Sequence, residues 1–460
     1  MSGTAVDQAA PPAGDTMPDG TAVTWPRLAA AVTAIMTGWA ALLGSMDVDW
    51  VPNDAKLLYL PTARNLLQHG AYSVMDQEPY LPTITKMPGY SFFLAAEQAI
   101  FGEGLAALQA FQLALVGVTA LLCADLARRL FDRRTATVAA VLVAGYPAFA
   151  VHAMEPLSET LTGLLLTANV HALVRHLADP AAGSAGRPGL RRAATHPLVQ
   201  LGITTGLLVL VRQSFAPVLV AQVVAVAATD RYRGHSWRPA LARAGVVAGL
   251  AVALIAPWCV RNIAVSDRLL PFGANSGLSL LVSVRQYADG PGTRPEYLDT
   301  IAAELATIDA AATPAGTAPG MGEGLGGGPA REVALDEALT RRARGELAEV
   351  PTARLLGTVP ARLVLLWSGA SMIELFDRIE LLLMAASLLS AAALGLRRRA
   401  CWPLWLPAAF LTAVHLVFHA EERYTLPARP ALLVLGAAGL VGAVRAGRRL
   451  VAPTTSGATP

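Results

Sequence analysis

The sequence has few charged residues, few aromatic residues and almost no lysine. Only 15% of its 460 residues are charged and 6% are aromatic, whereas 54% are hydrophobic and the mean hydropathy is +0.47. Because soluble domains carry about 25% charged residues, this shortage argues against a soluble enzyme. The net charge of +3 is too small to favour a polyanion, so we expect no nucleic acid among the partners.

Motifs for metals and nucleotides are also absent. The three cysteines, Cys123, Cys259 and Cys401, lie far apart without metal-type spacing, which excludes a disulfide framework. There is no P-loop, no GxGxxG after a strand and no HExxH, so a nucleotide-dependent cytosolic mechanism has no site. His415 and His419 are four residues apart but lack the acid of a metal-binding helix.

Long apolar segments dominate what remains. Since a membrane span needs about 20 apolar residues, the sequence predicts an all-α polytopic membrane protein with about ten spans. The predicted spans are 27–46, 105–127, 135–152, 157–178, 198–212, 214–229, 243–262, 379–396, 402–419 and 428–446. A further apolar piece at 89–101 is too short to cross and is expected to be re-entrant or interfacial.

Arginines in the short loops set the orientation. Residues 128–134 and 231–243 hold four arginines each, and 187–192, 397–399 and 445–449 hold three each. Placing these loops in the cytoplasm lets the ten spans alternate with both termini inside. We therefore expect a multi-pass protein of a bacterial inner membrane whose polar outer segments form a site facing outward.

This topology divides the chain into five parts. The parts are a disordered cytoplasmic tail (1–26), a transmembrane catalytic core with an outer loop at 47–88 (27–262), a mostly helical outer segment with a mobile stretch at 313–329 (263–378), C-terminal spans (379–449) and a short cytoplasmic tail (450–460). Juxtamembrane helices are expected at 57–70, 331–349 and 354–377.

Ionisable residues gather at the predicted outer ends of the spans, although charge is expensive near a membrane. Asp54 begins an outer amphipathic segment and is a candidate general base, or a simple helix cap. Lys86 is one of only two lysines in a chain with 34 arginines. It is either a phosphate ligand or an interfacial anchor. Glu155 and Glu159 stand at a helix start, where acids also suit the helix dipole.

Three further positions carry the same ambiguity. Arg212 interrupts a long apolar stretch and either closes a hairpin or binds an anion. Arg261 and Asn262 follow Trp258, where interfacial anchors are common. The last outer loop contains Glu421-Glu422-Arg423-Tyr424, which is either a local ion pair or part of a site. Together these residues predict a reaction site at the membrane surface for an anionic lipid headgroup.

At this point the sequence resembles the GT-C glycosyltransferases, the group that includes aminoarabinose transferases and protein O-mannosyltransferases. The likeness covers most of residues 27–446 and lies in an ordered set of motifs. The motifs are Asn53-Asp54, Tyr59-Leu-Pro-Thr-Ala63, Lys86-Met-Pro-Gly-Tyr90, Leu157-Ser-Glu159-Thr-Leu161, Leu210-Val-Arg212, Pro257-Trp-Cys-Val-Arg261-Asn262 and Glu422-Arg423-Tyr424.

The resemblance implies inverting transfer of a sugar from a polyprenyl-phosphate donor to a lipid, glycan or protein acceptor. Asp54 matches the family's essential acid, but it lies five residues before Tyr59 where four are expected, so Asp49 stays a second candidate. Positive charge on the phosphate lowers the barrier, and its expected ligands are Lys86, Arg212 and Arg261. Further substrate-site candidates are Tyr59, Glu159, Asn262, Glu422, Arg423 and Tyr424.

Some relatives use a divalent ion beside paired acids, and Asp49, Asp54 and Glu159 could supply such a site; no cofactor is otherwise indicated. Two other functions stay open. A transporter or flippase for a polyprenyl-linked glycolipid would move the lipid without chemistry, and a membrane scaffold would need none of these residues. The gathering of ionisable residues at one face favours the enzyme over both.

Overall fold

The computed structural model describes residues 23–178, 196–290, 303–304, 306–307, 327–369, 374–397 and 401–451. Within these ranges the chain is built of helices and contains no β-strand, which confirms the predicted all-α class. The Arg-rich loop at 187–192 and the tail at 450–460 lie outside the described residues, apart from Leu450 and Val451 of the latter. So do most of the tail at 1–26 and most of the stretch at 313–329.

Each of the ten predicted spans falls on a helix. In chain order these are α1 (Trp25–Gly44), α4 (Leu105–Leu130), α5 (Arg133–Ala144) with α6 (Pro147–Met154), α7 (Glu159–Ala178), α9 (Pro197–Val211), α10 (Ala216–Tyr232), α11 (Trp237–Ser266), α16 (Glu374–Arg397), α17 (Trp402–Val417) and α18 (Arg429–Val451). In the described ranges, five helical stretches are long and apolar enough to span a membrane, or six if α5 and α6 form one. The chain is a multi-pass membrane protein, and ten crossings stay a prediction.

The predicted span at 135–152 is broken into two helices. α5 ends at Ala144, α6 begins at Pro147, and the two are bent by 43°. Proline has no backbone N–H and fits the first turn of a helix, so Pro147 starts a new helix instead of continuing α5. The break places the buried Tyr146 where its hydroxyl accepts a hydrogen bond of 2.9 Å from Arg429, at the start of α18.

Small and polar side chains join the spans on one side of the bundle. A Cβ atom on Gly202 or Gly206 of α9 would come within 2.9 Å of a side chain of α11, so only glycine permits this approach. Asn169 of α7 donates to Thr205 of α9 at 3.0 Å and also accepts from Gln222 of α10. Gly202 and Gly206 therefore allow the close packing of α9 against α11.

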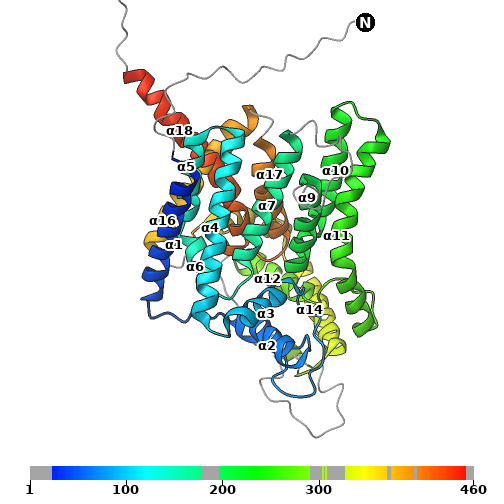
Figure 1. The fold of residues 1–460 in the computed structure, drawn as a ribbon. Helices are drawn as coiled ribbons and strands as arrows, with labels where there is room; N and C mark the ends of the chain where they lie inside the picture. The colour runs from blue at the N-terminus through cyan, green and yellow to red at the C-terminus, as the bar shows by residue number, and fades with distance from the viewer. Residues whose placement is uncertain are drawn as a thin grey trace, which may run out of the picture.

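Four helices form a cap at one end of the bundle, shown at the bottom of Figure 1. They are α2 (Leu60–His69), α3 (Gly89–Phe101), α12 (Ser276–Asp289) and α14 (Pro329–Glu349). α3 coincides with the short apolar piece predicted at 89–101. A short π-helical turn, η1 (Ala55–Tyr59), leads directly into α2, so the outer helix predicted at 57–70 starts earlier. α15 (Thr352–Trp367) follows α14 within the segment expected along the membrane surface.

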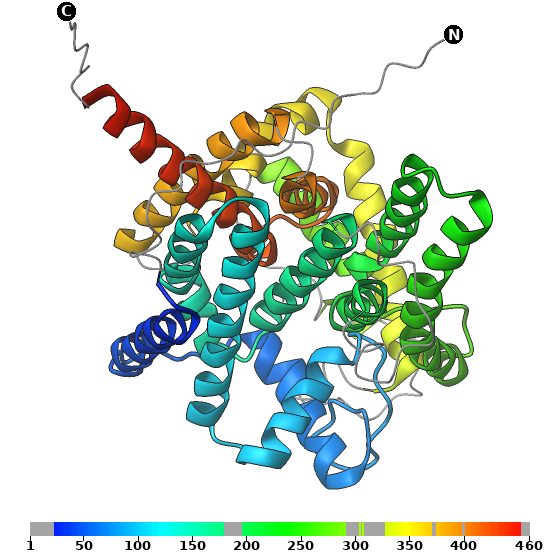
Figure 2. The ribbon, with the colours of Figure 1, turned by 45° about the horizontal axis from the view of Figure 1, so that its top comes forward.

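The opposite end of the bundle carries the α10–α11 connection and the projecting end of α18 (Figure 1). Arg445 of α18 pairs there with Asp132, in the α4–α5 connection, at 2.8 Å. In Figure 2, α10 and α11 form one flank of the bundle, and α1 and α16 the other. Two short 3₁₀ segments, η2 (Gln213–Phe215) and η5 (Glu422–Ala428), precede α10 and α18.

Candidate active site

A cavity of about 540 Å³ lies where the cap meets the bundle. Its walls come from the 85–87 segment, the ends of α9 and α17, the start of α7, the 270–276 loop and η5. Seven of the predicted site residues line it: Asp54, Tyr59, Lys86, Glu159, Arg212, Arg423 and Tyr424. Residues spread over most of the chain thus meet in one cavity of a size typical of ligand sites.

Arg423 joins three carboxylates at one side of this cavity. Its Nη2 lies 3.6 Å from Asp54 Oδ2, its Nη1 lies 3.8 Å from Glu159 Oε1, and its Nε donates to Glu421 Oε2 at 2.6 Å. Burial alone would raise the pKa of Glu421, but the hydrogen bond from His419 and the positive charge of Arg423 hold it well below its usual range. The carboxylate of Glu421 therefore keeps Arg423 in place.

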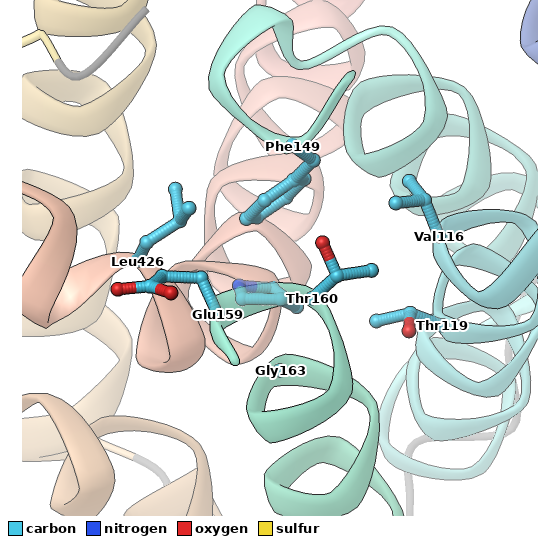
Figure 3. Close-up of a pocket in the computed structure, with 8 residues that line it drawn as sticks. Val116, Thr119, Phe149, Glu159, Thr160, Gly163 and Leu426 are labelled. Atoms are coloured by element: carbon cyan, nitrogen blue, oxygen red, sulfur yellow. The ribbon is translucent and has the colours of Figure 1, made fainter. Parts of the chain in front are cut away.

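Glu159 is the buried member of this network, with a side chain only 1% exposed. Arg212 Nη2 donates to its Oε1, and Arg212 Nε donates to Ser158 Oγ at 3.0 Å. Arg212 is thus an ion-pair partner and not only the end of a hairpin. A second, small cavity of about 20 Å³ lies against Glu159, beside Phe149, Thr160 and Leu426 (Figure 3). This volume suits about one water molecule.

Lys86 differs from the other two cations of the cavity. Arg212 and Arg423 are both paired with acids, whereas Lys86 has no ion pair in the described part of the chain. A cation without an internal partner is available to an anion from outside. Lys86 is therefore the residue of the cavity best suited to hold a phosphate group.

The segment that carries Lys86 is clamped from three sides. The N–H of Ile84 donates to Glu332 Oε2 at 2.6 Å, and its carbonyl accepts from Ala274 at 2.9 Å. The carbonyl of Thr83 accepts from Arg261 Nη1 at 2.6 Å. Burial raises the pKa of Glu332, the buried acid of this clamp on α14, to about 7.

Arg261 and Asn262, two predicted site residues, belong to the clamp and do not line the cavity. The guanidinium of Arg261 stacks on Trp258 and Tyr72, with its Cζ 4.7 Å and 5.3 Å from the ring centroids. Asn262 is fully buried and its Oδ1 accepts from Arg261 at 3.1 Å. The structure therefore places Arg261 behind the segment that carries Lys86, where it fixes the backbone.

The structure also separates the alternatives left open for the acids. Asp54 makes no side-chain capping bond to η1, so its position is not explained by helix capping. Asp49 is 68% exposed, pairs with Lys56 at 2.6 Å and does not line the cavity. In the last outer loop Glu421, and not Glu422, holds Arg423, while the backbone carbonyl of Glu422 accepts from Arg429 at 3.1 Å.

The divalent ion that the sequence left possible finds no suitable set of ligands among the described residues. Among the described residues, no three His, Cys, Asp or Glu side chains gather in a way that could hold a metal. Asp54 and Glu159 are both close to the guanidinium of Arg423, which occupies the position between them that a cation would take. We therefore derive no step that involves a metal.

Two residues of the site were not predicted from the sequence. Glu332 lies on α14 within an amphipathic pattern, and His415 was noted only as half of an unconvincing metal pair. No local pattern marks Glu332, because its role depends on Ile84, which is remote in sequence. For His415, its four-residue spacing from His419 was the only signal.

Comparison with known proteins supports the resemblance seen in the sequence. Residues 85–260 match the family model described as dolichyl-phosphate-mannose-protein mannosyltransferase. Archaeal oligosaccharyltransferase AglB from Archaeoglobus fulgidus, solved with an inhibitory peptide and a dolichol-phosphate, superposes over 94% of this chain with a TM-score of 0.52 at 16% identity. The chain has the GT-C glycosyltransferase fold.

The chain spans about half the length of the archaeal enzyme, because the match covers 53% of that protein. ArnT from Cupriavidus metallidurans, solved with undecaprenyl phosphate, also matches over 94% of this chain and 80% of its own, at 15% identity and a TM-score of 0.37. No curated protein matches the sequence.

Proposed function

We propose that the chain is a membrane glycosyltransferase that moves a sugar from a polyprenyl-phosphate donor to an acceptor at the extracytoplasmic face. The observation that carries this proposal is the single cavity holding Asp54, Lys86, Glu159, Arg212 and Arg423 beside the apolar residues Val211, Pro217, Val414 and Phe418. A charged headgroup fits the first set of side chains, and the first part of a lipid chain fits the second.

The reaction is a single displacement. Asp54 accepts the proton of the acceptor hydroxyl or amine as that group attacks the anomeric carbon, and the bond from this carbon to the phosphate oxygen breaks. Polyprenyl phosphate leaves with the bonding electrons, and Lys86 and Arg212 stabilise its growing negative charge. Attack from the face opposite the phosphate inverts the anomeric centre. Arg423 lies 3.6 Å from the carboxylate of Asp54 and orients it.

The distribution of arginines among the loops indicates the orientation of the chain in the membrane. The α4–α5 and α10–α11 connections contain many arginines, and the latter lies at the end opposite the cap (Figure 1). The cavity lies beside the cap. Arginine-rich short loops stay in the cytoplasm, so the cavity faces outward. A lipid-linked donor is held by the membrane itself, which removes the need for a nucleotide-binding domain.

The test is mass spectrometry of envelope glycolipids and glycans from cells that lack the gene, rescued with the intact protein, with Asp54→Asn or with Asp49→Asn. We expect one sugar to disappear from its acceptor and to return with the intact protein and with Asp49→Asn, but not with Asp54→Asn. Full rescue by Asp54→Asn at normal expression would remove the base from the proposal and favour a transporter.

A further inference from the structure

His415, in the last turn of α17, lines the cavity. Its ring stacks on Tyr424, with 4.5 Å between the ring centroids and 24° between the planes. Its Nδ1 lies 2.9 Å from the backbone carbonyl oxygen of His419. The proposed chemistry uses neither nitrogen of this ring.

The contact with His419 fixes the tautomer of His415. A carbonyl oxygen only accepts, so the proton of the neutral ring is on Nδ1 and Nε2 carries a free lone pair. The guanidiniums of Arg212 and Arg423 lie over the same Tyr424 ring, with Cζ 5.7 Å and 5.5 Å from its centroid. Nε2 of the neutral ring is therefore a hydrogen-bond acceptor with no hydrogen bond or ion pair to the described residues.

The backbone of His415 is held firmly. The fully buried Arg362 of α15 donates to the carbonyl of His415 at 3.2 Å and to Ser283 Oγ of α12 at 3.1 Å. A guanidinium that closes the end of α17 in this way satisfies carbonyls that the helix leaves unpaired. The imidazole ring is consequently fixed by its backbone, by its Nδ1 bond and by stacking, which is the arrangement of a preorganised binding group.

We propose that His415 Nε2 accepts a hydrogen bond from a hydroxyl of the transferred sugar, and that this sugar is uncharged. The inference rests on the proposed function. Among the cations that line the cavity, only Lys86 has no ion pair to the described residues, so it is available for the phosphodiester of the donor. Both lining carboxylates already lie beside arginines. An ammonium group on the sugar would add a charge beside Arg212 and Arg423, whereas a hydroxyl donates to Nε2 without one.

Two isosteric substitutions separate binding from structure. In His415→Asn the amide takes the place of Nδ1, so the bond to His419 is kept and the cavity acceptor is lost. In His415→Gln the amide reaches the place of Nε2, so the acceptor is kept and the bond to His419 is lost. A sugar-binding role and a merely structural role therefore predict opposite orders for these variants.

The experiment measures binding of lipids to the purified full chain in nanodiscs. The probes are undecaprenyl phosphate alone and undecaprenyl phosphate carrying glucose, mannose, galactose, arabinose or aminoarabinose. We expect a neutral-sugar lipid to bind best. We expect His415→Asn to weaken its binding about 5- to 10-fold, the effect of one hydrogen bond, and to leave binding of undecaprenyl phosphate unchanged. His415→Gln retains most of the affinity.

Other outcomes overturn the inference in distinguishable ways. A larger loss in His415→Gln than in His415→Asn assigns the residue a structural role. Equal losses for lipids with and without sugar show that His415 acts on the phosphate or lipid, and strongest binding of the aminoarabinose lipid refutes the uncharged sugar. Failure of the wild type to bind even undecaprenyl phosphate refutes the proposed function itself. Thermal unfolding of both variants confirms that they are folded.

Discussion

The guanidinium of Arg423, in η5, lies 3.6 Å from the carboxylate of Asp54, which begins η1. The last outer loop of the chain therefore closes onto the first. The same guanidinium lies near Glu159, at the start of α7. Three elements that are remote in sequence thus share one cation, so the position of the proposed base depends on the C-terminal third of the chain.

Replacing Arg423 tests this dependence. We expect Arg423→Gln to lower sugar transfer at least about 100-fold, because Asp54 loses the charge that orients it. Stability falls less, since Glu159 keeps Arg212 and Glu421 keeps His419. Arg423→Lys retains intermediate activity, because an ammonium cannot reach three carboxylates as a planar guanidinium does. The measurement is sugar on the acceptor in rescued cells, with thermal unfolding of the purified variants.

The matched control is Arg378→Gln on α16, where the arginine forms an exposed pair with Glu374. Such pairs contribute little, so neither activity nor stability changes. Wild-type transfer by Arg423→Gln would show that Asp54 does not need this cation.

Lys86 and Lys56, the only lysines of the chain, form a second matched pair. We expect Lys86→Ala to weaken binding of undecaprenyl phosphate to the purified protein at least about 10-fold, because its ammonium is the cation without an internal partner in the cavity. Lys56→Ala removes an exposed pair with Asp49 outside the cavity and leaves binding unchanged. Equal effects of the two substitutions would argue against a phosphate site at Lys86.

The sequence predicted the members of the site better than their roles. Four of the site residues stand at helix ends that the alternation of spans places on the same side of the membrane, and such ends come close together. They are Asp54, Glu159, Arg212 and Arg423. The predicted side of the membrane does not show whether a side chain lines the cavity or lies behind it. Arg261 shows this, because its orientation is decided by the rings of Trp258 and Tyr72 and by a remote carbonyl.

The sequence predicts the all-α class correctly but does not predict two details of the fold. The break between α5 and α6 follows from Pro147, but an apolar run hides it in a hydropathy profile. The contact between Glu332 and Ile84 cannot be predicted from the sequence for a different reason. The residue pattern of α14 is that of a solvated helix, and the carboxylate is buried only because α14 packs on the 83–86 segment.

The raised pKa of Glu332 predicts how stability depends on pH. Its pKa is about 7 in the folded protein and near 4.5 in an unfolded chain. Between these values the unfolded state releases the proton and the folded state keeps it, so the free energy of unfolding falls as pH rises from 4.5 to 7. We expect Glu332→Gln to flatten this slope. Above pH 7 its free energy of unfolding should exceed that of the wild type by up to about 3 kcal/mol.

Thermal unfolding of the purified protein between pH 4.5 and 8 checks this prediction. Glu337→Gln, on the same helix and half-exposed, is the control and retains the wild-type slope. An unchanged slope in Glu332→Gln would mean that Glu332 is ionised throughout and that the clamp does not titrate.

The contact of α12 with α14 allows a last prediction about the cap. A Cβ on Gly277 of α12 would lie 2.3 Å from the carbonyl oxygen of Asp336, whereas a Cβ on Gly345 of α14 meets nothing within 4 Å. We expect Gly277→Ala to separate the helices and lower the free energy of unfolding by about 1–3 kcal/mol. Gly345→Ala raises it by up to about 1 kcal/mol through helix propensity.

Because α14 carries Glu332, a displaced α14 also loosens the segment that holds Lys86. Gly277→Ala should therefore weaken binding of undecaprenyl phosphate, although Gly277 does not line the cavity. Gly345→Ala leaves that binding unchanged. If Gly277→Ala loses stability but binds the lipid normally, then the cap and the phosphate site are independent, and the position of Lys86 is fixed by Arg261 and Ala274 alone.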